Sequence, residues 1–123
     1  MGRALIGAIV GRRDILPREL ATRYPELGTV HWRRGGVPLL VAGLFLGRRG
    51  VSAITLWRVV FLAPDAPWHP ELLLHELRHV HQFGERLAFP VLYLWESIRR
   101  GYVQNRYEVD ARAYAAQRLR GLG

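Results

Sequence analysis

The stretch LLLHELRHVHQ, Leu72 to Gln82, decides the fold prediction and holds three of the five histidines of the chain. Apolar residues recur on most sides of the helix that it would form: Leu72, Leu73, Leu74, Leu77, Val80 and Phe83. A helix that is apolar around most of its circumference is typically buried. Histidine and glutamate are costly to bury unless they are paired or bind a metal. We therefore expect the polar residues of this helix to form a buried site.

Within this stretch, His75, Glu76 and His79 form the pattern HExxH. Four residues bring a helix back to within about 40° of the same face, about 6 Å further along its axis. Two imidazoles at this spacing can bind one ion, and the glutamate after the first histidine can reach a metal-bound water. The pattern predicts one Zn²⁺ per chain, held by His75 and His79, with Glu76 as the catalytic general base.

A catalytic zinc site needs a third protein ligand, and the chain has no cysteine. His81 would lie about 200° around the helix from His79, so it would point away. We favour Glu108, because Ala111 and Ala115 share its face of a later helix and would let that helix lie close to the first.

Glu96 and Asp110 are the alternatives for the third ligand. An ion pair with Arg99 or Arg100 would explain Glu96 without any metal. Asp110 has a shorter side chain, and it could instead orient His75 or His79 through a hydrogen bond to the ring nitrogen that does not bind the metal.

Other polar residues near the pattern could contact the ligands or a substrate. Gln82 follows His79 by three residues, and a hydrogen bond to the backbone explains it equally well. Tyr102 and Tyr107 are close in sequence to Glu108 and could donate to an oxyanion, although packing is the more common role of such residues.

The order of predicted elements indicates an α+β fold in one domain, residues 1–123, with a small mixed sheet packed on helices. We expect helices after Pro17, over 37–46, from Pro70 to Phe83 and ending at Gly84, over 90–100 and over 105–120. We expect strands over 29–34 and 53–64, a turn at Gly35 and Gly36, and a loop over 47–50.

The composition limits the other functions that the chain could have. The formal net charge is +8, and all eighteen basic residues are arginines. The arginines occur singly or in pairs, which does not indicate a specific nucleic-acid site, although peripheral contact with a membrane is compatible with them. The longest apolar run, 37–47, is too short to span a bilayer, and the first residues do not fit a signal peptide. We expect a cytoplasmic protein.

HExxH with a downstream glutamate resembles the gluzincin class of zinc metallopeptidases. More narrowly, LLLHELRHVHQ followed by YEVDARAYA is similar to small bacterial domains with the pattern HExxHxxQ and then ExEA, some of them found beside contractile injection systems. The resemblance covers about half of the chain. It implies a zincin-like fold, with His75, His79 and Glu108 as zinc ligands, Glu76 as general base, and Gln82 as the glutamine of the longer pattern. It also implies that the strand 53–62 is a sheet edge along which a peptide lies.

This chain departs from the pattern at two positions, since Asp110 stands where a glutamate is usual and Arg112 where an aspartate is frequent. The expected function is a minimal endopeptidase acting on a peptide or protein. The alternative is a non-catalytic zinc-binding scaffold that keeps the same fold. Because a chain of 123 residues leaves little room to enclose a cleft, a partner protein could supply the substrate specificity.

Overall fold

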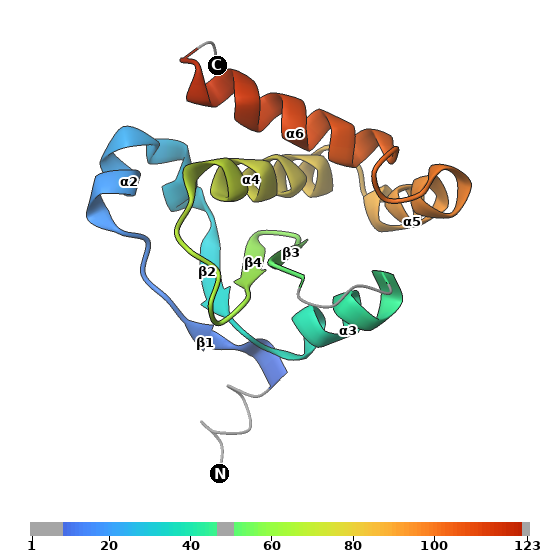
Figure 1. Cartoon of the computed structure of the whole chain (residues 1–123), viewed down its shortest axis with the longest axis horizontal. Helices are drawn as coiled ribbons and strands as arrows, with labels where there is room; N and C mark the ends of the chain where they lie inside the picture. Colours follow the sequence, from blue (N-terminus) through green and yellow to red (C-terminus); the bar gives the residue numbers. More distant parts are fainter. Residues whose placement is uncertain (1–8, 47–50, 122–123) are drawn as a thin grey trace. The chain divides into compact units, whose positions relative to one another are not determined.

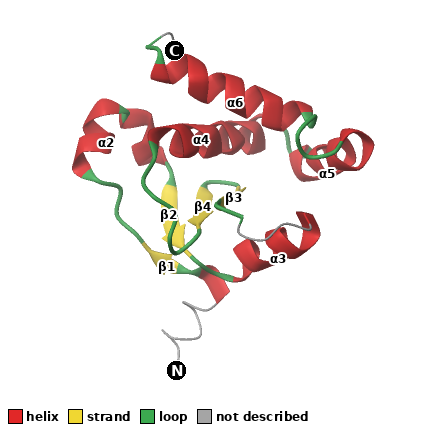
Figure 2. Cartoon of the chain, in the orientation of Figure 1, coloured by secondary structure: helices red, strands yellow, loops and turns green. Residues whose placement is uncertain are grey.

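The computed structural model describes residues 9–46 and 51–121, without the side chains of 43–46, and divides the chain into two compact units, Met1–Trp68 and His69–Gly123 (Figures 1 and 2). The predicted loop over 47–50 lies outside the described residues. Helices and a mixed sheet occur together, which confirms the predicted α+β class. The expectation of a single domain stays a prediction.

The first unit contains a four-stranded sheet in the order β1-β2-β4-β3. The strands are β1 (Arg12–Arg13), β2 (His31–Arg34), β3 (Ala53–Leu56) and β4 (Val59–Leu62), and the helices are α2 (Arg18–Arg23), the 3-10 helix η1 (Pro25–Thr29) and α3 (Val37–Leu46). Strands β2 and β4 are parallel, and the other two pairings are antiparallel. Helix α3 contacts β3 and β4, as expected for a helix that covers a small sheet.

The prediction of one strand over 53–64 is wrong, because this segment is the hairpin β3–β4. The turn is made by Trp57 and Arg58, and Trp57 has a φ of 55°. A two-residue hairpin turn with positive φ at its first position is usually built with glycine. Since tryptophan rarely adopts this conformation, the residues gave no signal of a turn here.

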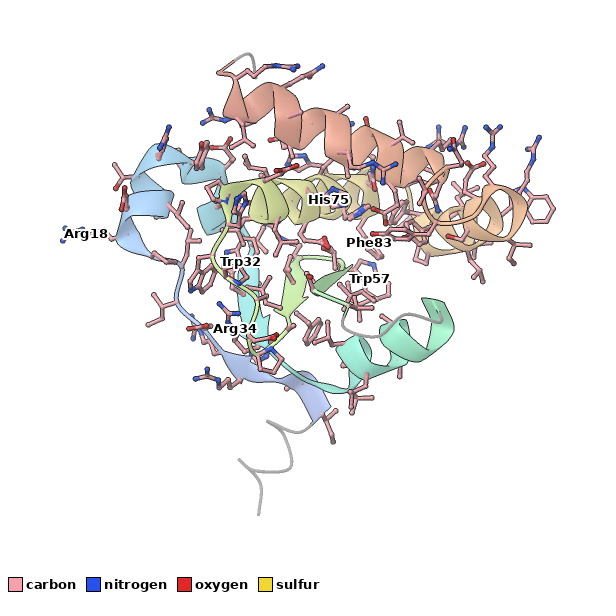
Figure 3. The ribbon with its side chains drawn as sticks, viewed as in Figure 1. Arg18, Trp32, Arg34, Trp57, His75 and Phe83 are labelled. Carbon is pink, nitrogen blue, oxygen red and sulfur yellow. The ribbon has the colours of Figure 1, made fainter. Side chains whose placement is uncertain are left out.

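Strand β2 buries two of its four side chains, Trp32 and Arg34, which are labelled in Figure 3. Trp32 is buried, and its indole N–H donates to the carbonyl of Leu27 at 3.0 Å. Arg34 is also buried, with its guanidinium donating to Asp14 at 2.8 Å and to the carbonyl of Ala63 at 2.9 Å. A buried arginine is stable only when its donors are satisfied, so these bonds fix β2 against the segments before and after it.

The short strand β1 was not predicted, and it depends on a glycine. Gly11 has a φ of 69°, and a Cβ at this position would collide with the carbonyl oxygen of Arg34. The predicted turn at Gly35 and Gly36 is confirmed, with φ values of 72° and 107°. Glycine adopts such φ values without strain. The pairing of β1 with β2 therefore depends on glycines at these positions, where a side chain would not fit the backbone.

The second unit consists of three helices, α4 (Pro70–Glu85), α5 (Phe89–Arg100) and α6 (Arg106–Leu119). Helices α4 and α6 lie side by side and run antiparallel (Figure 1). All three helices were predicted, but α4 continues one residue past Gly84, which lies inside the helix instead of ending it. The buried residues of α4 are Leu73, Leu74, Glu76, Leu77, His79, Val80 and Gln82. The apolar pattern thus correctly predicted a buried helix.

None of the helices in the described part of the chain is long and apolar enough to cross a membrane.

Candidate metal centre

Helix α4, which contains the HExxH residues, has strong start signals at its N-terminus. Pro70 occupies its first turn, and the ring of His69 accepts a hydrogen bond from the backbone N–H of Glu71 at 3.3 Å. Proline suits this position because its missing N–H would have no helical partner there. The capped start fixes the helical register one turn before His75, which is labelled in Figure 3.

The two histidines of α4 converge on one carboxylate oxygen of α6. The imidazole centroids of His75 and His79 are 4.9 Å apart, with an angle of 77° between their planes. The Nε2 atom of His75 lies 2.8 Å from Glu108 Oε1, and the Nε2 atom of His79 lies 3.1 Å from the same oxygen. Three atoms of ligand type therefore meet at one point between the two helices.

Glu108 reaches this point because α6 lies close to α4. Ala111 and Ala115 are almost completely buried, and their small side chains permit a close approach of the two helices. The N-cap of α6 is Asn105, whose side-chain oxygen accepts from the backbone N–H of Tyr107 at 2.9 Å. Asn105 is itself fully buried, so the start of α6, and with it Glu108, is held in a defined place.

Tyr93, on α5, is part of the site and was not predicted. Its hydroxyl donates a hydrogen bond to Glu108 Oε2, the carboxylate oxygen that the histidines do not contact. Its backbone carbonyl accepts from Asn105 Nδ2 at 3.1 Å, which ties α5 to the start of α6. The position of Tyr93 depends on how α5 packs, and no motif in the sequence reports that packing.

A chain of hydrogen bonds fixes the orientation of His79. Its Nδ1 lies 2.7 Å from Gln82 Oε1. The Gln82 amide nitrogen donates to Asp110 at 2.9 Å and to the carbonyl of Tyr107 at 3.0 Å, so the amide oxygen must face the imidazole. Asp110 also accepts from Arg78 at 2.6 Å. His79 Nδ1 therefore carries a proton, which leaves Nε2 as the atom that can bind a metal.

The charges in the site favour an ionised Glu108 beside a protonated His79. Burial opposes ionisation of Glu108, but hydrogen bonds from His75 and His79 outweigh it and hold the pKa of this carboxyl well below its usual range. Burial lowers the pKa of His79, yet its hydrogen bond to Glu108 and the charge of Glu76 raise it to about 9. Burial and the charge of Glu108 raise the pKa of Tyr93, so its hydroxyl remains a donor.

Glu76 lies beside the histidines and is almost completely buried, with 5% of its surface exposed. Burial raises the pKa of its carboxyl, and the positive charges of His79 and His75 only partly oppose this shift. The ligand atoms of His75, Glu76 and His79 lie within 4.8 Å of one another, and among the described residues these three form the cluster that could hold a metal ion.

The donor atoms fit a zinc ion. Atoms about 2.0–2.1 Å from a tetrahedral zinc are about 3.3 Å from one another. The observed separations of 2.8 and 3.1 Å between the imidazole nitrogens and Glu108 Oε1 differ from this spacing by a few tenths of an ångström. Two imidazoles and a carboxylate are a donor set that suits zinc. In the three-residue cluster that could hold a metal ion the carboxylate is that of Glu76, and the Glu108 carboxylate lies beside both imidazoles.

Three further acids and histidines near the pattern in sequence, Glu96, Glu85 and His81, have other partners. Glu96 accepts from the backbone N–H of Arg106 at 3.3 Å and pairs with Arg100 at 3.5 Å, a structural role that does not need a metal. The exposed Glu85 lies 3.6 Å from Arg78. The ring of His81 packs edge-on against Tyr114, 5.6 Å between centroids, away from the HExxH pair.

The two tyrosines predicted near Glu108 differ in their surroundings. The ring of Tyr107 packs against Phe89 and Tyr93, and its hydroxyl accepts from Arg106 at 3.0 Å. Tyr102 is half-buried, and it affects the site through its electrostatic influence on Tyr93. Their roles in catalysis stay predictions, as do those of Gln82 and Asp110.

Comparison with known proteins gives no relative: no family model, no curated protein and no solved structure matches the chain.

Proposed function

We propose that the chain is a zinc-dependent peptidase in which His75, His79 and Glu108 bind the ion and Glu76 is the general base. The observation that carries this proposal is the convergence of two imidazole Nε2 atoms on Glu108 Oε1, at 2.8 and 3.1 Å. A buried cluster of this composition has few structural uses, because apolar side chains would stabilise the same position at lower cost.

Two carboxylates compete for the place of third ligand. Glu108 contacts both Nε2 atoms from the facing helix, whereas Glu76 follows His75 directly on the same helix. A general base must accept a proton near neutral pH, and burial raises the pKa of Glu76 while the pKa of Glu108 is depressed. We therefore assign Glu108 to the metal and Glu76 to proton transfer.

The proposed reaction is hydrolysis of a peptide bond. A bound zinc ion supplies an acidified water and polarises the substrate carbonyl. Glu76 accepts the proton of the attacking water and then delivers it to the leaving amine. Gln82 holds His79 in the tautomer that exposes Nε2, and Tyr93 holds the second oxygen of Glu108 away from the reacting position. We propose a peptide or protein as substrate, with a partner protein supplying specificity.

Two matched substitutions test the assignment of roles. Glu76→Gln should keep one zinc per chain and lower turnover of a broad peptide library by about a hundredfold or more. Glu108→Gln should lower zinc affinity, whereas Glu96→Gln, another buried glutamate of the same unit, should leave zinc affinity unchanged. If Glu76→Gln loses zinc and Glu108→Gln keeps it, the two roles are reversed. If the wild type binds zinc and cleaves no more than Glu76→Gln, the chain is a non-catalytic zinc-binding scaffold.

A further inference from the structure

Helix α5 has an apolar stripe on its exposed side. The four residues Val91, Leu94, Trp95 and Ile98 are spaced so that they fall within about 100° of the helix circumference. Their exposed fractions are 69%, 39%, 58% and 71%. Large apolar side chains are common singly on a surface, but a continuous stripe of them marks a site of interaction.

The opposite side of α5 already has its partners. Phe89 and Glu96 are buried, and Tyr93 is bound to Glu108 and Asn105. The stripe is therefore not needed to attach α5 to the other two helices. The apolar surface continues before the helix at Leu87, which is fully exposed, and after it at Val103, which is 66% exposed.

Most of the charged residues around the stripe are basic, although the exposed Glu85 precedes Arg86 and pairs with Arg78. Arg86 precedes Leu87, and Arg99 follows Trp95 by four residues, which places it at the border of the stripe. Over residues 86–106 there are four arginines and one acid, a net charge of 4 − 1 = +3. The acid is Glu96, which is buried and engaged by Arg100 and the N–H of Arg106. The surface at α5 therefore combines apolar side chains with an excess of positive charge.

We propose that α5 is a membrane-surface helix, which lies in the interface of an anionic bilayer with Val91, Leu94, Trp95 and Ile98 in the acyl boundary. Tryptophan and branched apolar residues on one face, with arginines beside them, are the features of helices that bind in this plane. The arginines contact anionic headgroups, and their aliphatic stems can bury along the apolar surface. The proposal is independent of the metal centre.

The test is flotation of the full chain with vesicles of two compositions. Vesicles of equal parts phosphatidylcholine and phosphatidylglycerol should carry the protein, and vesicles of phosphatidylcholine alone should carry far less. Val91→Ser with Ile98→Ser should weaken binding to the anionic vesicles by about tenfold or more, and Arg99→Gln by about fivefold. Added salt should reduce the arginine contribution.

A matched pair on another helix provides the control. Leu40 and Val41 on α3 are also exposed, at 67% and 54%. Leu40→Ser with Val41→Ser should leave vesicle binding unchanged. The zinc content and the unfolding midpoint of both double variants should equal those of the wild type, because all four side chains are more than half exposed.

Three results would overturn the proposal. The first is a wild type that does not float with anionic vesicles. The second is loss of binding in the α3 variant while the α5 variant binds normally. The third is a wild type that self-associates through α5 in sedimentation velocity, with Val91→Ser and Ile98→Ser giving a monomer, since the stripe would then be an interface between two copies. Failure of peptide cleavage would leave this proposal untouched.

Discussion

Replacing Tyr93 with phenylalanine tests whether the hydroxyl on Glu108 supports metal binding. The substitution keeps the ring, which packs against His79 and Phe89, and removes the hydrogen bond from the Tyr93 hydroxyl to Glu108 Oε2. A hydrogen bond to a charged group contributes about 1.5–3 kcal/mol, which corresponds to about a tenfold to hundredfold change in an equilibrium constant. Glu108 is buried and cannot replace the lost donor with bulk water, so we expect the full effect.

The measurement is zinc affinity by competition with a chelator at fixed pH. Tyr93→Phe should bind zinc about ten to a hundred times more weakly than the wild type, within the usual effect of losing a group that supports a metal ligand. Tyr107→Phe is the control, because its hydroxyl contacts Arg106 and its ring lies in the same cluster. Equal zinc affinity in the wild type and Tyr93→Phe would refute the reasoning, as would an equal loss in both variants.

Three further predictions concern the residues around Glu108. Gln82→Ala removes the acceptor of the His79 Nδ1 proton and should weaken zinc binding about tenfold. Titration with chelator-buffered zinc measures this affinity. An unchanged affinity would mean that Gln82 does not orient the imidazole ring. Because the pKa of His79 is raised to about 9, zinc must displace a proton from its Nε2 atom. The zinc affinity should therefore rise with pH up to about 9, with release of one proton from this ring. A zinc affinity independent of pH between 6.5 and about 9 would contradict this. Asn105→Ala should lower the free energy of unfolding, measured by urea denaturation, by about 1–3 kcal/mol. The substitution removes the N-cap of α6 and two hydrogen bonds from the Asn105 side chain to α5. A change below about 0.5 kcal/mol, the usual scale of surface substitutions, would show that the cap is dispensable.

The raised pKa of His79 also determines how the stability of the metal-free protein depends on pH. The pKa of His79 is raised from 6.5 to about 9, so its protonated form stabilises the fold. This contribution is fully present below pH 6.5 and is lost as the pH rises through about 9.

The long helices were predictable because each has its own local signals. Helix α4 has Pro70 at its start and apolar residues on most sides, and α5 ends at Gly101, whose φ of 80° suits glycine. Asn105 is a standard N-cap residue and begins α6. Spacing alone predicted that His75 and His79 share a face of α4, because residues four apart on a helix lie within about 40° of each other. Glu76 lies close to them because it follows His75 directly.

The parts that were not predicted depend on contacts between distant segments. The hairpin at Trp57 breaks an apolar run in which no residue favours a turn, so tertiary pairing decides it. Strand β1 is two arginines long and exists through its register with Arg33 and Arg34. Tyr93 reaches Glu108 only because Asn105 joins α5 to α6, and sequence spacing between residues 93 and 108 carries no information about this contact.

The most direct test of the central claim is X-ray absorption at the zinc edge of the purified, zinc-loaded protein, compared with Glu108→Gln and Glu76→Gln. We expect two imidazole nitrogens and one carboxylate oxygen at about 2.0–2.1 Å from the zinc, with the remaining position filled by water. This spectrum should be preserved in Glu76→Gln and lost in Glu108→Gln. A wild-type spectrum without two imidazoles, or one that changes in Glu76→Gln and not in Glu108→Gln, would contradict the proposed centre.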